Sequence, residues 1–192
     1  KLAQVIKQSG LDPRSHAGKA LMSALDNYPR EEMFQISAGE LLEFATVIST
    51  LPDRPRVRVL PRIDRFDNFV SILVYLPRDR FDSEVRGKIG EHLAERYEGR
   101  VSAFAPDFPE GELARVHFII GRNGGPTPRP DREALESEIN ELSRSFADQL
   151  ASAAPDPTAI TGYADAFPRD YQAALSHLDA LADIAVFRSL DA

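Results

Sequence analysis

The chain contains no cysteine among its 192 residues. This absence excludes disulfide bonds, thiolate metal sites and a cysteine nucleophile, and it fits a reducing compartment. No apolar run approaches the roughly 20 residues that a membrane-spanning helix needs, and no signal peptide is recognisable. We therefore expect a cytoplasmic protein with no membrane partner.

Basic residues are fewer than acidic ones. The chain has 23 lysines and arginines and 30 aspartates and glutamates, which gives a net charge of −7. This balance argues against nucleic acid as a partner, because the phosphate backbone attracts basic surfaces. The hydrophobic fraction of 43% and the charged fraction of 28% are ordinary for a globular protein. A chain of this length can bury a sizeable core as one domain with helical extensions.

Recognisable catalytic motifs are also missing. The four histidines are His16, His92, His117 and His177. No two of them have the i, i+4 spacing of a helical metal site, so we expect no metal. His117 falls on a strand and is expected to be structural. There is no Gly-x-Ser-x-Gly motif for a serine nucleophile. Residues 121–130 are rich in glycine, but their prolines prevent the prompt helix start of a phosphate-binding loop, which favours a connector. We predict no catalytic residue.

Four segments have the pattern of strands. Residues 69–76 and 114–120 are almost continuously apolar, as in strands that are covered on both faces. Residues 56–63 and 101–107 contain proline, which belongs at a sheet edge because it lacks an N–H donor. The predicted order across the sheet is therefore 56–63, 69–76, 114–120 and 101–107.

Two helices complete the central module. Apolar residues at helical spacing predict one helix between 82 and 99, and a second, uninterrupted helix from 131 to 150. The order β-β-α-β-β-α is that of a ferredoxin-like or ACT-like α+β module whose last strand has moved to the front. We predict helical extensions at 1–52 and 155–192 around this module, which occupies 53–154.

Several short stretches resemble one family in their order and spacing. They are Ser9–His16, Tyr28–Ser37, Arg54–Arg58, Phe69–Glu84, Leu113–Ile120 and Tyr163–Tyr171. The chain resembles the N-terminal, ACT-like region of the large NAD-specific glutamate dehydrogenases of bacteria. The resemblance implies a parent enzyme that converts glutamate to 2-oxoglutarate and ammonia, with NAD bound in a catalytic domain outside this segment. It also implies that the segment serves regulation and assembly of a large homo-oligomer.

The loop after the strand 69–76 carries Arg78, Asp79, Arg80 and Asp82. In ACT modules the corresponding loop holds small effectors, often amino acids. Backbone donors at the start of the next helix and an arginine could bind a carboxylate here. The alternative is a solvated or domain-contacting loop in which the arginines pair with the two aspartates. The glycine that amino-acid-binding ACT modules usually have in this loop is absent, which favours the alternative.

The first edge strand carries Arg56, Arg58 and Arg62. A nucleic-acid stripe is disfavoured because no aromatic residues lie between them. We favour an interface with other domains or subunits of the parent, and a charged edge also prevents unwanted strand pairing. The flanking helices can pack on this module or on neighbours outside the chain, and exposed apolar stripes would indicate neighbours.

The leading hypothesis is therefore a non-catalytic regulatory or assembly segment of a glutamate dehydrogenase. The alternative in the binding class is an amino-acid sensor that uses the loop from Arg78 to Asp82. A stand-alone enzyme of another type is disfavoured by the missing motifs.

Overall fold

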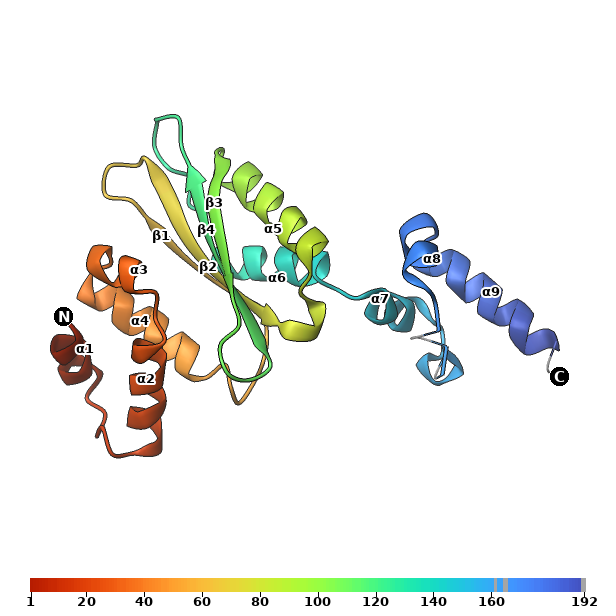
Figure 1. Cartoon of the computed structure of the whole chain (residues 1–192), viewed down its shortest axis with the longest axis horizontal. Coiled ribbons are helices and arrows are strands. Elements are labelled where there is room, and N and C mark those ends of the chain that lie inside the picture. The colour runs from red at the N-terminus through yellow and green to blue at the C-terminus, as the bar shows by residue number, and fades with distance from the viewer. Residues whose placement is uncertain (161, 164–165, 191–192) are drawn as a thin grey trace. The chain divides into compact units, whose positions relative to one another are not determined.

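The computed structural model describes residues 1–160, 162–163 and 166–190 (Figure 1). It contains two compact units, 1–143 and 144–192, each of which is described by itself. The predicted boundaries after residues 52 and 154 stay a prediction. Within the described residues, no helix is long and apolar enough to cross a bilayer.

The first unit is built around a four-stranded antiparallel sheet. Its strands are β1 (Arg58–Ile63), β2 (Phe69–Pro77), β3 (Arg100–Asp107) and β4 (Leu113–Gly121). The order across the sheet is β1-β2-β4-β3, and all three pairings are antiparallel. This order confirms the prediction, with the apolar strands in the centre and the proline-containing strands at the edges. The fold is the permuted ACT-like α+β fold expected from the sequence.

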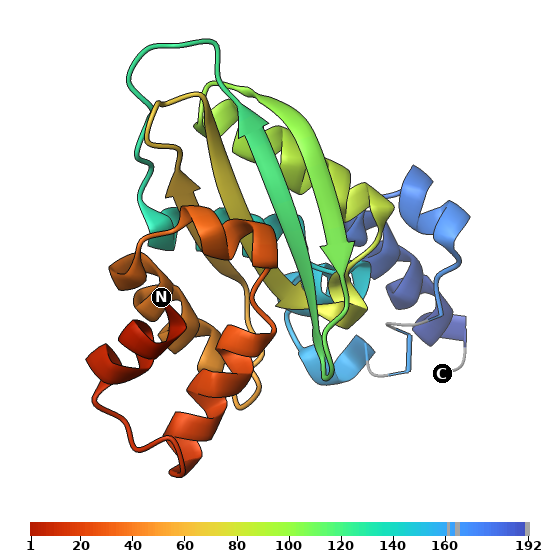
Figure 2. The same cartoon turned by 60° about the vertical axis from the view of Figure 1, so that its left-hand side comes forward.

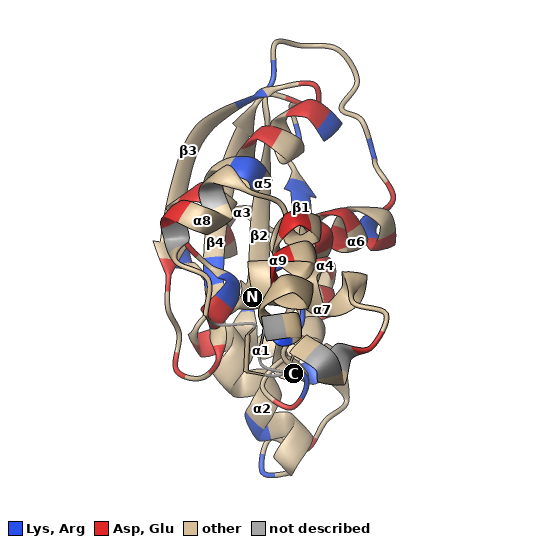
Figure 3. Cartoon of the chain, turned by 90° about the vertical axis from the view of Figure 1, so that its right-hand side faces the viewer, with Lys and Arg blue, Asp and Glu red and all other residues tan. Residues whose placement is uncertain are grey.

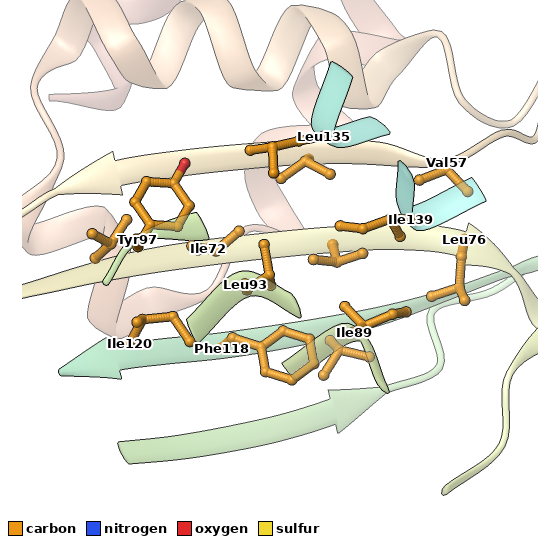
Figure 4. Close-up of a cluster of buried hydrophobic side chains, with 14 of the residues drawn as sticks. Val57, Ile72, Leu76, Ile89, Leu93, Tyr97, Phe118, Ile120, Leu135 and Ile139 are labelled. Carbon is orange, nitrogen blue, oxygen red and sulfur yellow. The ribbon is translucent and has the colours of Figure 1, made fainter. Parts of the chain in front are cut away.

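Two helices, α5 (Ser83–Arg96) and α6 (Arg132–Leu142), cover one face of the sheet. Every second residue of β2 and β4 points toward them, because side chains alternate between the two faces of a strand. Figure 4 shows Leu93 and Ile139 from the helices packed against Ile72 and Phe118 from the strands. This cluster forms the core between the sheet and these two helices.

The prediction of one continuous helix from 131 to 150 is wrong. The helix α6 ends at Leu142, and α7 (Phe146–Ala153) begins anew after Ser145. The Ser145 hydroxyl accepts a hydrogen bond from the N–H of Asp148, whose carboxylate accepts one from the N–H of Ser145. This capping box starts a second helix where the apolar spacing alone suggests that the first continues.

Four helices cover the other face of the sheet. They are α1 (Leu2–Ser9), α2 (His16–Asp26), α3 (Arg30–Gln35) and α4 (Ala38–Ser49). Figure 2 shows them on the side of the sheet away from α5. Leu25 and Leu41 pack there in one cluster with Leu60, Leu73 and Tyr75 of the strands. The N-terminal helices therefore pack on this module.

The second unit has its own small core. It contains α7, a 3₁₀ turn at Pro157–Ile160, α8 (Arg169–Ala174) and α9 (His177–Leu190). On α9, Leu178, Val186 and Phe187 are exposed, but their spacing distributes them around the helix and does not form a single apolar stripe. Of the predicted extension 155–192, residues 161, 164–165 and 191–192 lie outside the described part, as does part of the stretch 163–171.

Candidate effector and interface sites

Arg78 lies at the start of a single 3₁₀ turn, η1 (Arg78–Arg80), directly after β2. Its backbone N–H donates to the carbonyl of Glu112, 2.7 Å away, which ties this turn to the start of β4. Its guanidinium lies over the ring of Phe108, 5.0 Å from the centroid. Arg78 and Asp79 are both exposed. A guanidinium on an aromatic face keeps its N–H edges open to a ligand.

The other two residues of the predicted loop site already have structural contacts. Arg80 donates from Nη1 to Oδ1 of Asn140 on α6, at 3.3 Å. Asp82 is the N-cap of α5, because its carboxylate accepts a hydrogen bond of 2.8 Å from the N–H of Val85. The loop thus fixes the start of α5 on the sheet, with Arg78 as its exposed cation.

Two of the predicted interface arginines lie beside α6. Arg58 forms an ion pair with Glu136, which also accepts a hydrogen bond of 3.1 Å from the N–H of Val59. Arg56 is exposed and lines a shallow groove of about 600 Å³ together with Arg58 and residues of α6. Figure 3 shows that acidic residues predominate along α6, which has four glutamates after Arg132. Arg58 is therefore used within the chain, whereas Arg56 is open to a partner.

Arg62 points to the opposite face of the sheet and is only 5% exposed. Its Nε lies 2.7 Å from Oε2 of Glu32, and its Nη2 lies 2.8 Å from Oε1 of the same carboxylate. Glu32 belongs to α3 and is 3% exposed. Nη2 of Arg62 also donates to Gln35 at 3.2 Å. This buried bidentate ion pair holds the N-terminal helices on the sheet.

His117 extends this polar network across the sheet. Its Nε2 lies 2.7 Å from the hydroxyl of Ser71 and 3.7 Å from the carboxylate of Glu32. Burial raises the pKa of Glu32, but hydrogen bonds from Arg62 and Ser71 outweigh it and bring that pKa below its ordinary value. Burial lowers the pKa of His117, and the attraction of Glu32 offsets this only in part. His117 is therefore a neutral, structural histidine at pH 7, as expected.

The network predicts how stability depends on pH. The folded state disfavours protonated His117, so its pKa lies below the 6.5 of the unfolded chain. Stability from this residue is present above pH 6.5 and is lost as pH falls through the folded pKa. We expect His117→Asn to flatten the decline in the free energy of unfolding as the pH falls below about 6.5, measured by urea denaturation.

The matched control for that measurement is His92→Asn. His92 pairs with Glu138 near the surface, at 2.8 Å, and takes no part in the network. The other charged groups that act on His117 are Glu31, Arg115 and Arg62. An unchanged pH dependence in His117→Asn would contradict the assignment.

The glycine-rich loop after β4 is closed by Arg122, which the sequence analysis did not single out. Its Nη1 donates to the carbonyls of Tyr97 and Glu98, at the end of α5. Its Nη2 donates to the carbonyls of Gly124 and Pro126, at 3.3 and 3.0 Å. The buried guanidinium is directed at backbone acceptors, and the loop is organised as a connector between β4 and α6.

The first unit as a whole is a permuted ACT-like module with a helical segment docked on the sheet face opposite α5 and α6. Residues 58–147 match the family model described as glutamate dehydrogenase, ACT2 domain. Residues 1–54 match the model described as glutamate dehydrogenase, helical motif 1. The chain belongs to the family of large NAD-specific glutamate dehydrogenases, of which it is the N-terminal, ACT-like region. This confirms the resemblance found in the sequence.

Individual relatives agree with this assignment. The chain is 34% identical over its whole length to the NAD-specific glutamate dehydrogenase of Halomonas elongata, of which it covers 12%. It is 32% identical over 99% of its length to that of Pseudomonas aeruginosa, again covering 12%. The identity is 30% over 99% of the chain for the enzyme of Mycobacterium tuberculosis, with 13% covered. The chain thus spans only a small part of the relatives that it matches.

Proposed function

We propose that this segment is a non-catalytic regulatory or assembly part of a large NAD-dependent glutamate dehydrogenase. The parent would convert glutamate, NAD and water to 2-oxoglutarate, ammonia and NADH in the cytoplasm, with NAD bound outside the segment. The observation that carries the proposal is the buried pair of Arg62 and Glu32. It joins the helical motif to the ACT2 sheet as one unit, which suits a rigid element of a larger assembly.

Other domains and subunits of a homo-oligomer are the partners that this proposal requires. Arg56 is the exposed member of the three arginines that we predicted as an interface, since Arg58 and Arg62 have partners within the chain. The edge strand β3 is a second candidate surface, because all of its residues are exposed. An unpaired strand edge of this kind can accept another chain.

The proposal is tested in two experiments. The isolated chain, mixed with glutamate and NAD, is expected to form no NADH, and measurable turnover would overturn the non-catalytic assignment. In the full-length enzyme, Arg56→Glu is expected to weaken oligomer formation, measured by light scattering after gel filtration. Arg14→Glu is the control, because Arg14 is also exposed but lies on the helical motif, away from this groove.

A second candidate function is an amino-acid sensor at the loop from Arg78 to Asp82. The observation that favours it is the open guanidinium of Arg78 on the ring of Phe108. If this loop is the amino-acid site, Arg78→Ala abolishes a saturable calorimetric response to an amino acid, whereas Arg14→Ala leaves it intact. Silence across all twenty amino acids and 2-oxoglutarate would exclude the sensor and leave assembly as the function.

A further inference from the structure

A cavity of about 580 Å³ lies between the helical motif and the hairpin that joins β3 to β4. It is lined by α2, by the end of α4 with the segment up to Pro55, and by residues 109–115 of the hairpin. Its volume falls within the range of pockets that hold small organic molecules. Neither the loop from Arg78 to Asp82 nor Arg56 lines it, so it is distinct from the sites described above.

The floor of this cavity is apolar. Ala24 of α2, Leu51 after α4 and Leu113 of β4 are all buried and line it from three separate segments. The ring of Tyr75, at the end of β2, completes this floor. An aliphatic or aromatic side chain placed here would lose water from its surface, which is favourable in proportion to the area buried.

A positively charged side chain, that of Arg115, lies beside the apolar floor. The guanidinium of Arg115 lines the cavity and is held from two sides. Its Nη1 donates to the carbonyl of Asn27 at the end of α2, and its Nη2 donates to Asp107 at 2.7 Å. A guanidinium has more N–H groups than these bonds use, and its fixed orientation suits a carboxylate.

Two acidic residues of the hairpin turn also line the cavity. Glu110 and Glu112 line the cavity on either side of Gly111, whose φ of 109° is in the region that favours glycine. Within the part of the chain that the structure describes, neither carboxylate has a hydrogen-bond or ion-pair partner. Both are therefore available to an ammonium group.

We infer that this cavity binds an α-amino acid with an apolar side chain. The carboxylate would meet Arg115, the ammonium would meet Glu110 or Glu112, and the side chain would cover the floor formed by Leu51 and Leu113. The regulatory meaning of such binding rests on the proposed function, but the binding itself does not. The ligand would bridge the helical motif and the hairpin, and the hairpin is joined to the loop of Arg78 through the carbonyl of Glu112.

The test is a calorimetric titration of the chain with leucine, valine and phenylalanine. We expect saturation at one site per chain for at least one of them. The hydroxy-acid analogue of that amino acid, which lacks the ammonium, should bind at least about tenfold more weakly, because a charge-assisted hydrogen bond is lost. The double variant Glu110→Gln with Glu112→Gln should weaken binding of the amino acid by a similar factor. Its circular dichroism should match that of the parent chain, since both residues are on an exposed turn.

Arg78→Ala separates this inference from the sensor proposed above. Binding that survives Arg78→Ala and weakens in the double glutamine variant supports the cavity. Binding that is lost in Arg78→Ala and unchanged in the glutamine variant overturns the cavity and supports the loop. Silence with all three amino acids also overturns the cavity, while an assembly role, measured on the oligomer, would be unaffected.

Discussion

Replacement of Arg62 by alanine is expected to lower the free energy of unfolding by about 3–5 kcal/mol. The reason is the carboxylate that remains. Glu32 is 3% exposed and receives both of its short ion-pair contacts from Arg62. Without Arg62 its charge stays buried without a cationic partner at ion-pair distance other than His117, which is neutral at pH 7, among the described residues, and desolvation of an unpaired charge is unfavourable. Urea denaturation at pH 7, followed by circular dichroism, measures the loss.

Two controls make this result specific. Lys88→Ala breaks an i, i+4 ion pair with Glu84 of 2.6 Å that is exposed, and it should change stability by no more than about 0.5 kcal/mol. The double variant Arg62→Met with Glu32→Leu should lose less free energy of unfolding than Arg62→Ala, because it leaves no unpaired charge in the interior. If Arg62→Ala and Lys88→Ala lowered the free energy of unfolding by the same amount, the pair of Arg62 and Glu32 would not be what holds the N-terminal helices on the sheet.

The position of the Arg62–Glu32 pair also predicts which part of the structure Arg62→Ala destabilises first. The ion pair is the polar link between α3 and the sheet, so its removal should loosen the helical motif before the sheet opens. Hydrogen exchange should therefore accelerate in α3 more than in β2. The same comparison shows whether the two family segments, 1–54 and 58–147, behave as one cooperative unit.

The order of the strands could be predicted because its signals are local. Proline marks both edge strands, and the apolar runs of β2 and β4 mark strands covered on both faces. The capping box of Ser37 and Glu40, which starts α4, is a local signal of the same kind. The break between α6 and α7 also had a signal, in Ser145 and Asp148, but the continuing apolar spacing concealed it.

The role of Arg62 could not be predicted in this way. Arg62 is one of three arginines on an edge strand, and this set indicated a strand face directed at a partner outside the chain. That face is covered by α3, whose Glu32 is separated from Arg62 by thirty residues in sequence. A contact between two distant segments leaves no periodic trace in either of them. The cavity beside Arg115 was missed for the same reason, since four separate segments of the chain line it.

Phe118→Ala is the second change with a large expected effect, a loss of about 3–5 kcal/mol in the free energy of unfolding. Phe118 is 1% exposed and lies between β4 and α5. A Cβ atom added at Gly90 of α5 would lie 3.2 Å from Cε1 of this ring, so the helix backbone rests directly on it. Truncation leaves a cavity beneath α5, because the surrounding side chains of this cluster collapse only in part.

The matched control is Phe104→Ala. Phe104 lies directly opposite Phe118 in the ladder between β3 and β4, but it is 45% exposed and packs mainly against the guanidinium of Arg86, 4.1 Å from its centroid. Its loss should cost about 1 kcal/mol. Equal losses in the two variants would contradict a core centred on Phe118. A large loss of stability for Phe118→Ala alone would show that β3, whose own residues are all exposed, depends on the buried core beside it.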